Sequence, residues 1–124
     1  MSLLLLAYWE LLVLEVPIRR KDFAAIYERV RRTPIANRTN RTSGAAQICQ
    51  AVDLAAVLYF HKVLCLQRSA AAVCLLKRRG FPGQLVVGVQ PRPFAAHAWV
   101  ELDGAVVNDR PYMPDIYAVL ERCG

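Results

Sequence analysis

Long hydrophobic runs and secretion signals are missing from this chain of 124 residues. The longest uncharged apolar run, Leu3 to Trp9, is far shorter than the ~20 residues of a membrane-spanning helix, and Glu10 and Glu15 interrupt the sequence after it. No basic stretch precedes the run, and no small-residue cleavage site follows it. The sequence therefore predicts no membrane span and no signal peptide, and the cytoplasm is the expected compartment.

The spacings that bind structural metal ions are also missing. The chain has four cysteines and two histidines: Cys49, Cys65, Cys74, Cys123, His61 and His97. The cysteines are too far apart for the close pairs of a zinc site, and the histidines form no H-x-x-x-H pair. Disulfide frameworks are typical of secreted chains, so reduced thiols are expected here. We expect neither a metal ion nor another cofactor.

Disorder and internal repeats are not indicated either. Hydrophobic residues make up 56% of the chain and charged residues 21%, a composition too apolar for an unfolded chain. There is no low-complexity segment, and the length suits one compact domain. We therefore predict a single domain over residues 1–124.

Positive charge is unevenly distributed. The formal net charge is +6, and the segment from Ile18 to Arg41 has eight Arg and Lys residues against only Asp22 and Glu28. Such a segment fits nucleic acid, an acidic peptide or an anionic membrane surface, and its sign alone does not choose between them. Because no nucleic-acid-binding signature accompanies the charge, nucleic acid is not an expected partner. A solvated helix face is the simplest interpretation, and a docking surface for a protein partner is the alternative.

Apolar periodicity predicts four helices in the first two thirds of the chain. They are Leu3–Val16, closed by Pro17; Lys21–Arg32; a third helix from an N-cap at Ser43 to about Tyr59; and Leu64–Arg79, stopped by Gly80. The second has one apolar face while its arginines occupy the other positions. The polar segment from Thr33 to Gly44 is expected to be a loop.

Strand patterns follow the helices. The expected elements are a strand over Leu85–Val89, a loop at Pro91 and Pro93, a hairpin of Ala96–Leu102 and Ala105–Asp109 about Asp103-Gly104, and a last short helix over Asp115–Glu121. Helices first and strands afterwards is the order of an α+β domain rather than of a parallel βαβ sheet.

Cys65 is the candidate nucleophile. It falls at or near the start of the predicted fourth helix, where unpaired backbone N–H groups favour a thiolate and can bind an oxyanion. The thiol also needs a base within hydrogen-bond reach, and His97 is the candidate. His61, four residues before Cys65, is a rival base on the same helical face but has no acid downstream. The alternative for Cys65 is a small buried hydrophobic residue, which is how we interpret the other three cysteines.

The hairpin predicts which acid would support His97. A three-residue loop, Leu102-Asp103-Gly104, pairs His97 with Asp109 and puts both side chains on one face. Asp109 would then accept the imidazole N–H and stabilise the imidazolium. A two-residue turn would instead pair Leu102 with Ala105 and put the two side chains on opposite faces.

Two short blocks carry a family resemblance. Residues 65–69 read C-L-Q-R-S and residues 96–101 read A-H-A-W-V-E, with Gly88-Val89 between them and Gly104 and Asp109 after them. Over about Leu64 to Asp109 the chain closely resembles the stand-alone leader peptidase of lasso-peptide biosynthesis, a bacterial branch of the transglutaminase-like cysteine proteases. The N-terminal helices resemble this family only in being rich in leucine and arginine.

The resemblance implies a papain-like arrangement in which Cys65 is the nucleophile, His97 the general base and then acid, and Asp109 the residue that orients His97. It implies a papain/transglutaminase-like core over residues 61–124, in which the helix with the cysteine packs on a small antiparallel sheet, after a helical part over residues 1–60. Such enzymes cut the leader from a ribosomally made lasso precursor peptide. A small leader-recognition protein delivers the leader, and a separate ATP-dependent lasso cyclase closes the ring.

Several alternatives stay open at this point. The same fold supports acyl transfer to an amine instead of water, and a non-catalytic adaptor would bind an acidic leader through the basic segment. Gln47 and Gln50 are candidate side-chain donors to the oxyanion. Arg68 and Ser69 are expected to cap or brace their helix, and Trp99, on the same side as His97, to shield it or to line the cleft.

Overall fold

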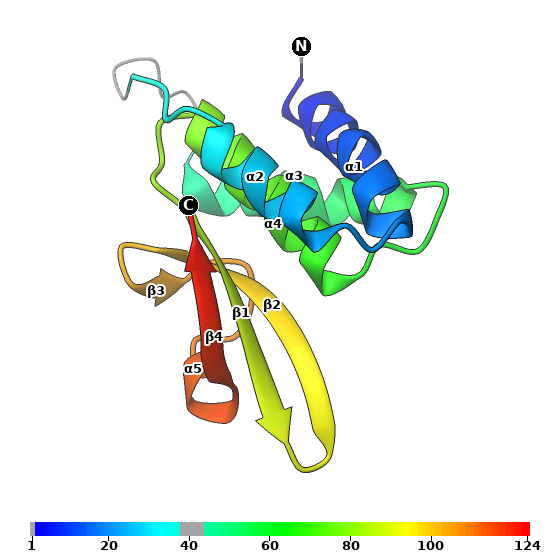
Figure 1. Cartoon of the computed structure of the whole chain (residues 1–124). Helices are drawn as coiled ribbons and strands as arrows, with labels where there is room; N and C mark the ends of the chain where they lie inside the picture. The colour runs from blue at the N-terminus through cyan, green and yellow to red at the C-terminus, as the bar shows by residue number, and fades with distance from the viewer. Residues whose placement is uncertain (1, 38–43) are drawn as a thin grey trace.

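The helices gather at one end of the molecule, and the sheet extends away from them (Figure 1). The structure is a computed structural model that describes residues 2–37 and 44–124. Its elements are α1 (Leu3–Arg19), α2 (Phe23–Arg32), α3 (Ala45–Leu58), α4 (Cys65–Arg78), β1 (Gln84–Pro91), β2 (Phe94–Leu102), β3 (Ala105–Val106), α5 (Met113–Ile116) and β4 (Ala118–Cys123). The predicted α+β fold is therefore confirmed. No helix in the described part of the chain has the length and apolar character needed to cross a membrane.

Helix α4 is the centre of the helical layer. It packs against α1, α2 and α3 on its sides and against β2 of the sheet. Its small and aliphatic residues are almost all fully buried, as Ala70, Val73 and Leu76 show. Burial on nearly every side explains why this helix has no wide polar face.

The sheet is antiparallel with the strand order β3-β2-β1-β4. Alternate residues of β2 point to opposite faces. Ala98 and Val100 pack into the large core under the helices. Trp99 packs with Val86 and Met113 in a smaller core on the other face, which α5 covers. The candidate site described below lies on β2, the strand that contributes side chains to both cores.

Helix α1 runs past its predicted end at Val16 and continues to Arg19, with Pro17 inside its last turn. A proline removes one backbone N–H donor, which is a small loss so close to a helix end. The Arg20 N–H still donates to the Val16 carbonyl at 3.0 Å and closes the turn. The predicted N-cap of α3, Ser43, lies outside the described residues, and Gly44 is the N-cap of the helix in the structure.

The predicted C-terminal helix over Asp115–Glu121 is wrong. Only Met113–Ile116 is helical, and Ala118–Cys123 forms β4 along the free edge of β1. Pairing with β1 satisfies backbone groups that would otherwise be an open sheet edge, and it buries Cys123 in the core. This tertiary pairing overrides the local helical pattern.

Of the two turns that the sequence left open for this hairpin, the structure has the two-residue turn and not the three-residue loop. Leu102 pairs with Ala105, so the turn is the two-residue Asp103-Gly104. Both turn residues have positive φ, 53° for Asp103 and 81° for Gly104, which is the geometry whose twist matches a right-twisted hairpin. The second strand of this hairpin is Ala105–Val106 rather than the predicted Ala105–Asp109.

Candidate active site

Cys65 is the first residue of α4, as predicted, and Leu64 is the N-cap. The first main-chain bond of this helix runs from the Arg68 N–H to the Leu64 carbonyl at 3.1 Å. The N–H groups of Cys65, Leu66 and Gln67 therefore have no carbonyl of their own helix to bond. These donors surround the start of α4 and are suited to binding an anionic oxygen next to the thiol.

His97 and Asp109 are joined by a hydrogen bond of 2.6 Å between Nε2 and Oδ2. Both side chains are largely covered, with 23% and 18% of their surfaces exposed. Burial pushes the Asp109 pKa up, but the hydrogen bonds from His97 and from the Arg110 N–H outweigh this and hold the pKa below its ordinary value. Asp109 is thus kept as a carboxylate. Because its bond to His97 uses Nε2, the other ring nitrogen, Nδ1, is not engaged by Asp109.

Asp109 reaches the His97 side by a route that differs from the predicted one. In the observed two-residue register, a continued ladder would put these side chains on opposite faces. The ladder ends early: the Val107 N–H donates to the Val100 carbonyl at 3.0 Å, but the Val100 N–H donates to the Asn108 side-chain oxygen at 2.7 Å. The chain leaves the strand at Asn108, and Asp109 turns toward His97.

A side-chain network fixes this departure. The Asn108 amide donates to the Ser69 hydroxyl at 3.0 Å, and that hydroxyl donates to the Ala98 carbonyl at 3.2 Å. Ser69 is fully buried on α4 and braces the helix against β2, as expected. Sequence reasoning missed Asn108. The available signal was a polar amide next to Asp109 at the end of a predicted strand.

Two aromatic rings cover the imidazole of His97. Tyr117 stacks on it with ring centroids 5.5 Å apart, and Trp99 lies at 6.2 Å. Trp99 is fully buried, and its indole N–H donates to the buried carboxylate of Glu101 at 3.0 Å. Gly88 faces His97 across β1 and β2. A Cβ at Gly88 would lie 2.8 Å from the Trp99 ring, so only glycine lets the ring approach β1 this closely.

Cys65 and His97 line the same cavity. It has a volume of about 250 Å³, and its wall is otherwise apolar: Phe23, Tyr27, Leu66, Val87, Ala96 and Ala98. Among the hydrogen bonds of the described residues, none joins the Cys65 thiol to the His97 ring. The structure thus brings His97 and Asp109 into contact and puts Cys65 in the wall of the neighbouring cavity.

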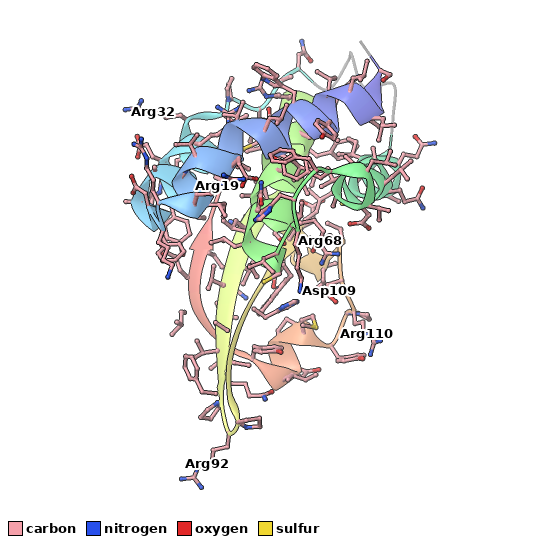
Figure 2. All side chains as sticks on the ribbon, turned by 90° about the vertical axis from the view of Figure 1, so that its right-hand side faces the viewer. Arg19, Arg32, Arg68, Arg92, Asp109 and Arg110 are labelled. Atoms are coloured by element: carbon pink, nitrogen blue, oxygen red, sulfur yellow. The ribbon has the colours of Figure 1, made fainter. Side chains whose placement is uncertain are left out.

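A second hollow lies on the other side of Cys65. It has a volume of about 620 Å³ and is more polar, with Asp53, Lys62 and Arg68 in its wall. Arg68 pairs with Asp53 at 3.6 Å and lies close to Asp109 in space (Figure 2). Burial and the nearby Asp109 charge raise the Asp53 pKa, which Arg68 opposes. Arg68 is therefore paired with Asp53, and its charge also helps to lower the Asp109 pKa.

The other candidates lie away from this arrangement. His61 is exposed and precedes the first residue of α4, so it shares no helical face with Cys65. The Gln47 side chain accepts from the Gly44 N–H at 3.0 Å at the start of α3, and Gln50 is exposed. Neither glutamine is among the described residues that line the two cavities beside Cys65.

The remaining cysteines are buried thiols. Cys49, Cys74 and Cys123 are at most 4% exposed, and all four cysteines of the chain are free. Burial together with the Asp53 charge raises the pKa of Cys49 to about 11. Within residues 2–37 and 44–124, no group of three His, Cys, Asp or Glu side chains is arranged to hold a metal ion.

Comparison with known proteins gives a family match and a curated relative. The family described as the transglutaminase-like superfamily matches residues 9–122. A curated relative, the microcin J25-processing protein McjB of Escherichia coli, is 43% identical over 56 residues, which is 45% of this chain. The matched segment spans only 27% of the length of that relative. No solved structure matches significantly.

Proposed function

Since the chain belongs to the transglutaminase-like superfamily, we propose that it is a cysteine peptidase that removes the leader from a ribosomally made lasso precursor peptide. The observation that carries this proposal is the 2.6 Å bond between His97 and Asp109 beside a cavity that Cys65 also lines. The similarity to a microcin-processing protein supports the substrate class. We assign residues 1–124 to one catalytic domain that works in the cytoplasm.

In the first half-reaction, Cys65 Sγ attacks the carbonyl carbon at the junction of leader and core. The thiol proton passes to His97 Nδ1, because Nε2 is bonded to Asp109. Asp109 stabilises the imidazolium that results. When the tetrahedral intermediate collapses, the C–N bond breaks, and the proton on Nδ1 moves to the departing amine of the core. The leader is left as a thioester on Cys65.

In the second half-reaction, a water attacks the thioester while His97 Nδ1 accepts its proton. Collapse releases the leader with a free carboxyl group, and the proton returns to the Cys65 sulfur. The freed amine of the core is the group that a separate ATP-dependent cyclase would need for ring closure. This order puts leader removal before ring closure.

The oxyanion of both intermediates would be bound by the backbone at the start of α4. The N–H groups of Cys65, Leu66 and Gln67 are free of helical bonds there. One such donor is worth ~2.7–4 kcal/mol in related acyl-transfer sites. The Gln67 side chain is not one of the donors, because it donates instead to the Leu11 carbonyl at 2.9 Å in the helical core.

Acyl transfer to an amine is the second candidate, and the superfamily membership is what favours it. The two reactions share the thioester and differ only in what attacks it. Product mass separates them, since hydrolysis adds water to the leader and transfer adds the amine. A non-catalytic adaptor would give neither product.

The test is intact-mass analysis of the precursor peptide encoded beside this protein, incubated with a leader-recognition protein and the enzyme. We expect one cut at the junction of leader and core with the wild type, and none with Cys65→Ala. Cys49→Ala is the matched control and should cut at the wild-type rate, since Cys49 is buried and lines neither cavity. Cutting by Cys65→Ala would remove this residue from the mechanism, and an intact precursor with the wild type would favour the adaptor.

A further inference from the structure

A groove between α2 and the end of α4 lies on the other side of α2 from the cavity beside Cys65. Its volume is about 410 Å³, and its wall consists of Ala25, Glu28, Arg29, Arg32, Thr33, Pro34 and Arg78. Three of these seven side chains are guanidinium groups. The proposed peptidase chemistry uses none of them.

A buried carboxylate holds two of the arginines in place. Glu10 of α1 is only 2% exposed; one of its oxygens accepts a hydrogen bond from Arg29 Nη2 at 2.9 Å, and the other forms an ion pair with Arg78 Nε at 2.9 Å. Two cations therefore share one carboxylate, and the cluster keeps a positive excess. Because the bonds fix both guanidinium groups, little side-chain freedom remains to be lost when an anion binds.

Three further cations lie in or beside the groove. Arg32 pairs with Glu28 at 2.7 Å, and Arg31 reaches the same carboxylate at 3.8 Å and Glu121 at 3.5 Å. Lys77 is 3% exposed, and its ammonium group donates to the Val30 carbonyl at 2.7 Å rather than to a carboxylate. The groove is thus surrounded by more cationic than acidic side chains, within a Debye length of one another.

We propose that this groove binds the carboxylate groups of an acidic peptide segment. The fixed guanidinium pairs match carboxylates in geometry and charge. Nucleic acid fits less well, because no aromatic side chain that could stack on a base lines the groove. Phe23 and Tyr27, the aromatic residues of α2, line the cavity beside Cys65 instead.

The position of the groove gives the site a use. The groove includes Arg78 at the end of α4, and Cys65 at the start of this helix is about 20 Å away at ~1.5 Å per residue. An extended peptide spans this distance in about six residues. A peptide held by its acidic residues in the groove would keep neighbouring residues close to the thiol. The role of the groove in holding a peptide near the thiol rests on the proposed function, but the binding of an acidic peptide to the groove does not. Peptide binding is therefore measured in the Cys65→Ala protein, which lacks the proposed nucleophile.

The experiment measures fluorescence anisotropy of labelled hexaglutamate at low salt, with hexaglutamine as the uncharged reference. We expect hexaglutamate to bind at least about tenfold more tightly than hexaglutamine, and Arg32→Glu to weaken it about tenfold. Glu28→Gln should tighten binding, because it releases Arg32. The control is Arg92→Glu, since Arg92 lies at the far tip of the β1–β2 hairpin while Arg32 lies on α2 (Figure 2). Its effect should stay below about twofold.

Several outcomes would overturn the proposal. Equal losses of hexaglutamate affinity in Arg32→Glu and Arg92→Glu would show attraction by net charge alone. Equal affinities for hexaglutamate and hexaglutamine would show that the groove does not recognise the charge of the peptide. Tighter binding of a twelve-residue oligothymidylate, or of phosphatidylglycerol vesicles, would assign the groove to a nucleic acid or to a membrane. Arg32 has 79% of its side chain exposed, and a circular dichroism spectrum checks that its variant stays folded.

Discussion

The Asn108 side chain accepts the Val100 N–H at 2.7 Å, in the position where a regular antiparallel ladder would use the Val107 carbonyl. This exchange of a backbone acceptor for a side-chain acceptor ends β3 after two residues. It also sets the direction in which Asp109 leaves the sheet. The contact between His97 and Asp109 therefore depends on Asn108, which takes no part in the proposed chemistry.

Replacing Asn108 by alanine should release Asp109 from His97. We expect kcat to fall by about 10–100-fold, because small misplacements of a catalytic group have effects of this size, while KM changes less than about twofold. Ser69→Ala should have a smaller effect in the same direction, since Asn108 keeps its bond to Val100. Steady-state cleavage and urea unfolding of each variant are the measurements. A folded Asn108→Ala protein with wild-type kcat would contradict this role.

Gly88→Ala should disturb the rings over His97. The new Cβ would meet the Trp99 ring and the Tyr117 Cβ at 2.8 and 2.9 Å, and overpacking of this kind costs about 1–3 kcal/mol. Urea unfolding measures the loss. Gly44→Ala is the control: nothing lies within 4 Å of its added Cβ, so only the weaker N-cap preference of alanine acts there, and the change should stay below about 1 kcal/mol. Equal stability of the two variants would refute the close packing at Gly88.

The stability difference between the wild type and Asp109→Asn should shrink in acid. The Asp109 pKa is lower in the folded chain than its ordinary value of 3.8, so the unfolded chain takes up this proton more readily. The carboxylate thus stabilises the fold fully above the ordinary value, and this stabilisation is lost as the pH falls through the lower folded value. Urea unfolding at pH 6 and pH 3 tests it. Asp53→Asn is introduced into both proteins, because the Asp109 charge contributes to the raised Asp53 pKa and this contribution would otherwise differ between them. A difference that stays constant with pH would argue against the shift.

Iodoacetamide at pH 7.5 should modify Cys65 well before the other thiols. Cys65 is partly exposed, whereas Cys49, Cys74 and Cys123 are buried. Cys49 is further protected because burial and the Asp53 charge raise its pKa to about 11, which leaves little thiolate. Peptide mass mapping over time gives the order of modification. Comparable rates at Cys49 and Cys65 would show that the helical core opens readily.

Local signals identified the helices well. At the start of α2, the Asp22 side chain accepts the Ala25 N–H at 3.1 Å. After the end of α4, Gly80 has a φ of 90°. Both are capping interactions of residue types that the sequence displays directly. The position of Cys65 at the start of α4 follows from the same local pattern. Helix ends depend on neighbours a few residues away, which is why they can be predicted.

Nonlocal contacts account for the errors. The segment over Ala118–Cys123 becomes a strand only because β1 offers it an edge, and no residue within it signals that partner. Likewise, Asp109 meets His97 although the hairpin has the two-residue turn, because Asn108 bonds to Val100 and to Ser69. Ser69 is 39 residues away from Asn108 in sequence, a separation that no pattern within the hairpin reveals.

The stacking of Tyr117 on His97 has a consequence for the protein as it is being made. Synthesis proceeds from the N-terminus, so the ribosome adds Cys65, His97 and Asp109 before it adds this ring and strand β4. A nascent chain that ends before Tyr117 has its thiol and imidazole but lacks one of the two rings that hold the imidazole. The complete site therefore forms only after the ribosome has added Tyr117.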